Sequence, residues 1–191
     1  MRDKILEVCI PQSRSQLEVP PFWRPTGITD KFVVLDGLNL MYLRNPKPKL
    51  TNLLTIVLHV AQNASDFSCV FDANTRHQLA RAGRFDDANA YVDLLDNFDS
   101  FFIEVTGGTR ADDVILAEAD ARSAIVVSND RFRPYVEQYQ WLKERNRLLH
   151  ANPFREHVHF NGHSLPIRSK LQRAIKSLEN TIGKFHDAAL A

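Results

Sequence analysis

The sequence predicts an α/β fold around a central parallel sheet of four to five strands. Short apolar runs rich in valine and phenylalanine alternate along the chain with longer segments of helical periodicity. Parallel strands need a long crossover between them, and a helix is the usual crossover. With 191 residues and 44% hydrophobic content, the chain can bury the core of one such domain.

The first 30 residues are predicted to form an extended arm. Four prolines lie there among polar residues, and proline neither donates a backbone hydrogen bond nor fits inside a helix or a central strand. Phe22 and Trp23 are expected to anchor this arm against the domain.

Strands and helices are predicted to alternate regularly from residue 31. Strands are predicted from short, mainly apolar runs, and helices from apolar residues that recur every three or four positions. In chain order the elements are a strand over Phe32–Leu35, a helix over Leu50–Ala61, a strand over Phe67–Phe71, a helix over Arg84–Leu95, a strand over Phe101–Val105, a helix over Thr109–Arg122 and a strand over Ala124–Val127. This alternation predicts right-handed crossovers.

Beyond Asp130 the pattern predicts smaller elements and a final helix. We expect a helix over Tyr135–Lys143, a further strand over Arg147–Leu149 and a strand over His157–Phe160 that pairs at a sheet edge. From Ser169 onward, apolar residues return at helical spacing on one face.

Four aspartates lie at the ends of predicted strands or the start of a helix. Asp36 ends the first strand, Asp112 and Asp113 open a helix, and Asp130 follows the fourth strand. The carboxyl ends of parallel strands are where α/β folds bind ligands. Carboxylates that converge there repel one another unless a hard cation lies between them. The four residues therefore predict one acidic pocket that holds a divalent metal ion.

Three of these aspartates also have a purely structural interpretation. Asp36 could form a turn without a ligand, Asp112 could complete a capping box with Thr109, and Asp130 could cap a following helix. These interpretations leave Asp113 unexplained, so the four aspartates taken together favour a functional site over purely structural roles.

Two further residues belong to the same predicted edge. Gly37 is expected to permit a tight turn after the first strand. Asp72 follows the second strand, where it could equally serve as a fifth metal ligand or as a turn residue.

Composition argues against several classes of protein and indicates the cellular compartment. Cys9 and Cys69 have no paired spacing, which argues against a disulfide framework or a zinc site and favours a reducing cytoplasm. No apolar run reaches the roughly 20 residues of a membrane span, and no signal-peptide pattern opens the chain. The formal charge of +1 shows no strong basic excess, although basic residues cluster beside the candidate site loops.

Four segments carry motifs in a consistent order along the chain. They are Phe32–Tyr42 with the text VVLDGLNLMY, Phe71–Arg76, Ala111–Val114 with the paired aspartates, and Ile125–Arg133 with the text IVVSNDRFR. Together they resemble the PIN-like nucleases, and within them the NYN domains related to the Regnase ribonucleases. The resemblance covers about residues 32–154 and implies a PIN-like three-layer α/β/α domain over residues 31–165, between an arm over residues 1–30 and a C-terminal helical extension over residues 166–191.

The resemblance also implies an activity. Asp36, Asp112, Asp113 and Asp130 would hold Mg²⁺ or Mn²⁺ in a metal-dependent endoribonuclease that hydrolyses single-stranded or loop RNA. The predicted substrate-binding residues are Asn39, Arg76, Ser128, Asn129, Arg131 and Arg133. Phe132 and Tyr42 could stack a base, but core packing is the prediction for both.

Two other functional classes agree less well with the sequence than a nuclease does. A PIN-like module without catalysis could act through a partner, but the complete acidic set argues for an enzyme. An aspartyl-phosphate phosphatase needs a second aspartate two residues after the first, where this chain has Leu38. Besides RNA, a second copy of the chain or a regulatory protein stays open as a partner.

Overall fold

The computed structural model describes residues 27–43, 46–144 and 146–189, with side chains described as far as residue 183. The predicted arm, including its Phe22 and Trp23 anchor, therefore lies almost wholly outside the described residues. None of the described helices is long and apolar enough to cross a membrane.

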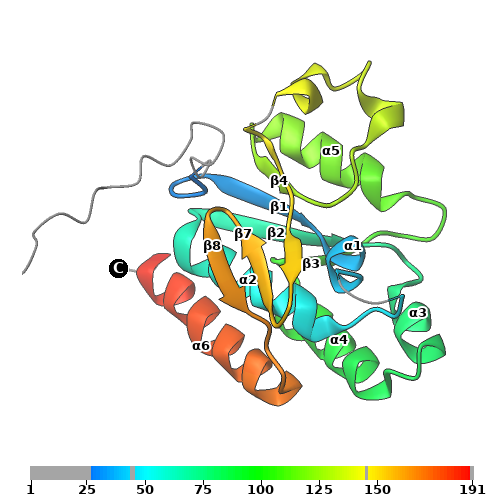
Figure 1. The fold of residues 1–191 in the computed structure, drawn as a ribbon, viewed down its shortest axis with the longest axis vertical. Coiled ribbons are helices and arrows are strands. Elements are labelled where there is room, and N and C mark those ends of the chain that lie inside the picture. Colours follow the sequence, from blue (N-terminus) through cyan, green and yellow to red (C-terminus); the bar gives the residue numbers. More distant parts are fainter. Residues whose placement is uncertain (1–26, 44–45, 145, 190–191) are drawn as a thin grey trace, which may run out of the picture.

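Five parallel strands form the central sheet in the order β3-β2-β1-β4-β5 (Figure 1). The strands are β1 (Phe32–Asp36), β2 (Asp66–Phe71), β3 (Phe102–Glu104), β4 (Ile125–Val127) and β5 (Leu148–Leu149). From β1 the chain winds outward through β2 to β3, and it then crosses to the other side of β1 to form β4 and β5. The strand order thus reverses between β1 and β4, the position where open α/β sheets bind ligands. The prediction of a parallel sheet is confirmed.

Helices cover both faces of this sheet. They are α1 (Gly37–Met41), α2 (Leu50–Asn63), α3 (Thr75–Arg81), α4 (Phe85–Asn97), α5 (Ala111–Ala121) and α6 (Leu171–Ala189). Successive side chains of a strand point to opposite faces. Accordingly, Val33 and Leu35 of β1 pack in the core shared with α2, α4 and α6, whereas Val34 packs in the core shared with α5. Figure 1 shows α5 on one face of the sheet and α2, α4 and α6 on the other. The three-layer α/β/α architecture is confirmed.

A second, antiparallel sheet was not predicted. It contains β6 (Asn152–Phe154), β7 (His157–Phe160) and β8 (His163–Pro166) in that order. The segment expected at a sheet edge is its middle strand, β7. Asn161 and Gly162 form the two-residue turn into β8, both with positive φ, and Asn-Gly at this position is a strong hairpin signal.

The predicted helix over Tyr135–Lys143 is wrong. Two short 3₁₀ turns, Arg133–Tyr135 and Gln140–Lys143, occupy this region instead. Pro134 lies in the first of them, and the Trp141 side chain is buried in the core on the α5 side of the sheet. The segment therefore follows the packing of its aromatic residues rather than one continuous helical face.

Gly37 provides space rather than the predicted turn geometry. Its φ is not positive, but a Cβ atom placed on it would overlap the ring of Phe71, which is buried against Tyr91 and Phe102. The α1 backbone therefore approaches β2 at a distance that only glycine permits.

We predict that Gly37→Ala lowers the free energy of unfolding by about 1–3 kcal/mol, because the buried ring must move to admit the methyl group. Gly107→Ala is the matched control, since a Cβ atom there meets nothing within 4 Å. Urea denaturation of both variants measures the difference. Equal stabilities would show that the contact with Phe71 is not the constraint.

Candidate active site

Asp36 lies at the carboxyl end of the central strand, where the strand order reverses. Its side chain is only 8% exposed. The Ser128 hydroxyl, which follows β4, donates to Oδ2 at 2.6 Å, and the backbone N–H of Asn39 donates to Oδ1 at 3.3 Å. Asp36 thereby caps α1 and joins the ends of β1 and β4.

Burial raises the pKa of Asp36 from 3.8 to about 7. The hydrogen bonds from Ser128 and Asn39 lower this pKa, whereas the charges of Asp112 and Asp72 raise it further. An ionised Asp36 is therefore costly at this position unless positive charge lies nearby.

The carboxylate of Asp112 belongs to the same group. Burial raises its pKa, Arg110 lowers it, and the charges of Asp130 and Asp72 raise it. The structure thus brings Asp36, Asp72, Asp112 and Asp130 close enough to influence one another at one edge of the sheet.

Asp113 has a different environment from its neighbour. It is exposed, and it accepts a hydrogen bond of 2.7 Å from the hydroxyl of Tyr135. Burial, this hydrogen bond and the charge of Asp113 together raise the pKa of Tyr135 to about 12. The two adjacent aspartates therefore have different partners, with Asp112 coupled to the acidic group and Asp113 bonded to Tyr135.

The capping box considered for Thr109 and Asp112 does not form. Arg110 is the N-cap residue of α5, and no side chain caps that end. The Arg110 guanidinium instead donates to the Asp112 carboxylate at 3.0 Å. The structural interpretation of Asp112 as a capping residue is thus wrong.

Ser128 positions the acidic residues from inside the protein. Its side chain is fully buried, donates to Asp36 and accepts a 3.0 Å hydrogen bond from the backbone N–H of Asp130. Asp130 is exposed, and its Oδ1 accepts from the backbone N–H of Phe132 at 2.9 Å. The Ser128 side chain has no exposed surface, and a contact between it and the substrate stays a prediction.

Asn39 and Asn129 also bond within the protein. Asn39 Oδ1 accepts from the backbone N–H of Asn129 at 2.9 Å. The Asn129 amide bonds both the N–H and the carbonyl of Ala151, at 3.0 and 2.9 Å. These bonds fix the loop after β4 against α1 and the segment after β5, and substrate contact by either asparagine stays a prediction.

The predicted cationic residues lie on the surface around this edge. Arg76 is exposed on α3, and Arg131 and Arg133 are exposed on either side of Phe132. Phe132 is buried with φ of 47°, a conformation that bulky residues rarely adopt. Its predicted core packing is confirmed. For Tyr42 the same prediction is wrong, because its side chain is exposed and its hydroxyl donates to Gln78.

The described residues of the acidic group do not form a closed cage for a metal ion. Within the described ranges, no three His, Cys, Asp or Glu side chains are arranged to hold a metal ion together. Mg²⁺ usually binds through one or two carboxylates and keeps several waters. Burial raises the pKa of Asp36 and of Asp112, and repulsion from neighbouring carboxylates adds to it. A bound dication would offset both costs.

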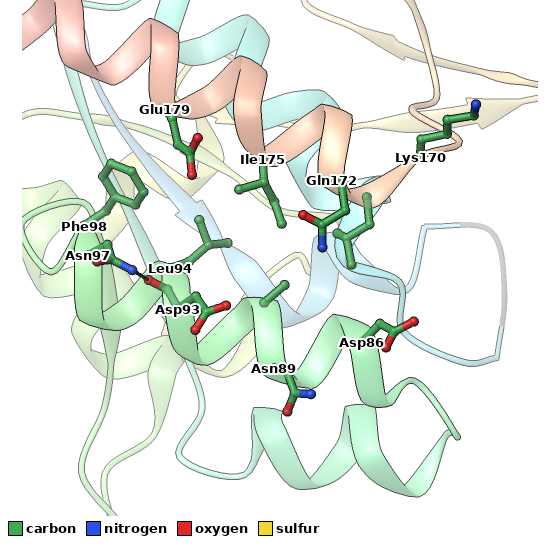
Figure 2. A pocket seen from close by; sticks show the side chains of 12 residues that line it. Asp86, Asn89, Asp93, Leu94, Asn97, Phe98, Lys170, Gln172, Ile175 and Glu179 are labelled. Atoms are coloured by element: carbon green, nitrogen blue, oxygen red, sulfur yellow. Dashed lines mark hydrogen bonds between the residues drawn. The ribbon is translucent and has the colours of Figure 1, made fainter.

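A cavity of about 620 Å³ lies elsewhere, between α4 and α6 (Figure 2). Leu94, Phe98 and Ile175 line it, and its acidic side chains come from residues outside the predicted site. None of the predicted site residues lines this cavity. The acidic edge is therefore identified by its chemistry and not by cavity volume.

The sequence was compared with known protein families to find the one to which the chain belongs. The family described as Zc3h12a-like Ribonuclease NYN domain matches residues 29–161, well over half of the chain. The chain belongs to this NYN ribonuclease family. The relationship to the PIN-like nucleases and to Regnase that the sequence motifs indicated is thereby confirmed.

Solved structures support the fold of this NYN domain. A crystal structure of nuclear proteinaceous RNase P 2 from A. thaliana matches with a TM-score of 0.56 and 14% identity, covering 73% of this chain and 31% of the other. A second structure of nuclear protein-only RNase P 2 from Arabidopsis thaliana gives 0.53 and 15%, with 69% and 29% covered. The NYN domain thus spans less than a third of those chains. A search of curated proteins finds no match.

We predict a pH-dependent stability that comes from Asp36. Its folded pKa of about 7 lies above the ordinary value of 3.8, so folding takes up a proton between these values. Asp36 therefore favours folding below about pH 4, and this contribution is lost as the pH rises to about 7. In chelating buffer, the difference in free energy of unfolding between Asp36→Asn and the wild type should shift by a few kcal/mol in favour of the variant from about pH 4 to about pH 7. Above about pH 7 this difference should stay constant. Urea unfolding at several pH values measures this difference, and a pH-independent difference would contradict the burial of the charge.

We further predict that Ser128→Ala costs about 1–3 kcal/mol of stability, because the buried hydrogen bond to Asp36 and the partly buried one from the backbone N–H of Asp130 are both lost. Ser177→Ala is the control, since that hydroxyl bonds only back to the Arg173 carbonyl on α6. Urea unfolding at pH 8 compares the two variants. A Ser128→Ala variant as stable as the control would remove this serine from the account of the site.

Proposed function

We propose that this NYN domain is a metal-dependent endoribonuclease that hydrolyses single-stranded or loop RNA with Mg²⁺ or Mn²⁺. The observation that carries the proposal is the buried Asp36, placed where the strand order reverses and near the charges of Asp72 and Asp112, with Asp130 in turn near Asp112. Membership of a ribonuclease family supports an RNA substrate.

In this proposal each carboxylate has a distinct part in the site. Asp36, buried at the end of β1, and Asp112, half-buried in the first turn of α5, would bind the ion. Asp130 and Asp72 would bind water molecules of the ion's shell. Asp113, oriented by Tyr135, would add acceptor oxygens at the rim. When bound, the ion would lower the pKa of a water molecule and screen the charge of the phosphate under attack.

The arginines would hold the RNA backbone. Arg76 lies on one side of the acidic edge, after β2, and Arg131 and Arg133 lie on another, after β4. Guanidinium groups pair well with phosphate oxygens, and contacts from two sides would align one strand across the carboxylates. The backbone conformation of Phe132 keeps both neighbouring arginines on the surface while its own ring is buried.

The compartment and the partners are part of the same proposal. A reducing cytoplasm suits Cys69, which is a free thiol buried in the core. The alternative remains a catalytically silent module that binds RNA or protein, with a regulatory protein or a second copy as partner.

We predict metal-dependent internal cleavage of RNA. The full chain is incubated with end-labelled single-stranded and hairpin RNA in Mn²⁺, in Mg²⁺ or in EDTA. Asp36→Asn and Asp130→Asn should each lower the cleavage rate by about 100-fold or more, because each removes charge from the group that holds the ion. Asp120→Asn is the matched control, since Asp120 is an exposed aspartate on α5 outside the acidic group.

Cleavage that persists in EDTA, or in both site variants, would contradict the metal mechanism. Binding of the RNA without any cleavage in either metal would favour the silent module.

A further inference from the structure

A cavity of about 370 Å³ lies between the end of α1 and the face of α3. Each of these helices begins beside a carboxylate of the proposed site, since α1 follows Asp36 and α3 follows Asp72 after two residues. Tyr42 at the end of α1 is six residues from Asp36, or roughly 9 Å at the rise of a helix. Neighbouring nucleotides of one strand can bridge such a spacing.

Tyr42 presents an exposed aromatic ring to this cavity. The side chain is 36% exposed, and the hydroxyl donates to Gln78 Oε1 of α3 at 2.8 Å. This bond fixes the ring without burying it. A fixed ring with one accessible side is what stacking with a nucleobase requires.

Polar amides continue from the tyrosine along α3. Gln78 accepts from Tyr42 and donates from Nε2 to Asn74 Oδ1 at 2.7 Å. Both amides line the cavity. Carboxamides carry donors and acceptors that can pair with the edge of an unpaired base.

The charge of the cavity is positive. Lys47 and Arg81 line it, and none of its lining residues is acidic. The cavity between α4 and α6 differs, because Asp86, Asp93 and Glu179 line that one with a single lysine. A cationic cavity with an exposed aromatic ring suits an anionic ligand that has a flat ring, and single-stranded nucleic acid has both features.

We propose that this cavity binds one nucleotide of the RNA strand next to the scissile phosphate. The base would stack on Tyr42 and meet the amides of Gln78 and Asn74, while Lys47 and Arg81 would contact the backbone. The inference rests on the proposed function, since the strand that it recognises is the RNA substrate. It makes Tyr42 a specificity residue outside the acidic group.

The test measures binding without cleavage. Fluorescence anisotropy in EDTA gives the Kd of the full chain for a labelled single-stranded RNA. Tyr42→Ala should weaken binding about tenfold or more, the effect of losing one stacked base, whereas Tyr42→Phe should stay within about threefold of the wild type. Arg81→Ala should weaken binding and reduce the salt slope by about one. Phe154→Ala is the control, since Phe154 is an exposed aromatic on β6 that does not line the cavity.

An abasic scan identifies the base itself. A single abasic nucleotide is moved along the RNA, and for the wild type one position should weaken binding markedly. In Tyr42→Ala the abasic change at that position should have a clearly smaller effect than in the wild type, because the stacking partner of that base is already absent and only its contacts with Gln78 and Asn74 remain to be lost.

The inference is overturned if folded Tyr42→Ala binds like the wild type, or if the abasic penalty is equally large in that variant. If thermal unfolding shows that Tyr42→Ala is not folded, the abasic scan is compared between the wild type and Arg81→Ala instead. A scan in which no position weakens binding more than the others then overturns the inference. Tyr42-dependent binding by a chain that never cleaves RNA would contradict the proposed function alone. Cleavage that does not depend on Tyr42 would contradict this inference alone, and an absence of any RNA binding would contradict both.

Discussion

The rest of the site depends on the burial of one carboxylate at the end of the central strand. Because β1 packs into two cores, Asp36 is placed with little freedom where the strand order reverses. Desolvation opposes its ionisation, and within the described part of the chain the hydrogen bonds from Ser128 and Asn39 offset part of this cost. The negative charges of two further carboxylates, Asp72 and Asp112, make the ionisation of Asp36 still less favourable. Positive charge placed beside Asp36 would therefore stabilise its ionised form, which is the basis of the proposed metal site.

The surrounding structure holds this edge in place before any ligand binds. Ser128 joins the ends of β1 and β4, and the pair Asn39 and Asn129 joins α1 to the segment after β5. Asp112 arrives from α5 on the other face of the sheet, so the acidic group combines elements from both layers. Groups held in this way need little reorganisation when a phosphate binds, which is how electrostatic catalysis gains its effect.

The sequence predicts the features that depend on local signals. Strands buried on both faces and aspartates directly after them were visible without a structure. Other features depend on distant residues. Gly37 matters because of Phe71, and Ser128 reaches Asp36 only through the pairing of Leu35 with Val127, which no local pattern reveals. The second sheet is different, because its Asn161-Gly162 turn is a local hairpin signal, whereas its strands are too short for periodicity to predict the sheet.

The most direct test locates the ion itself. Anomalous diffraction from a crystal of the full chain soaked in Mn²⁺ identifies manganese independently of any assumed ligand. The account predicts a peak in contact with the carboxylate of Asp36 and adjacent to Asp112, and no such peak in Asp36→Asn. Manganese bound only elsewhere on the protein, with the Asp36 side chain unoccupied, would contradict the central claim.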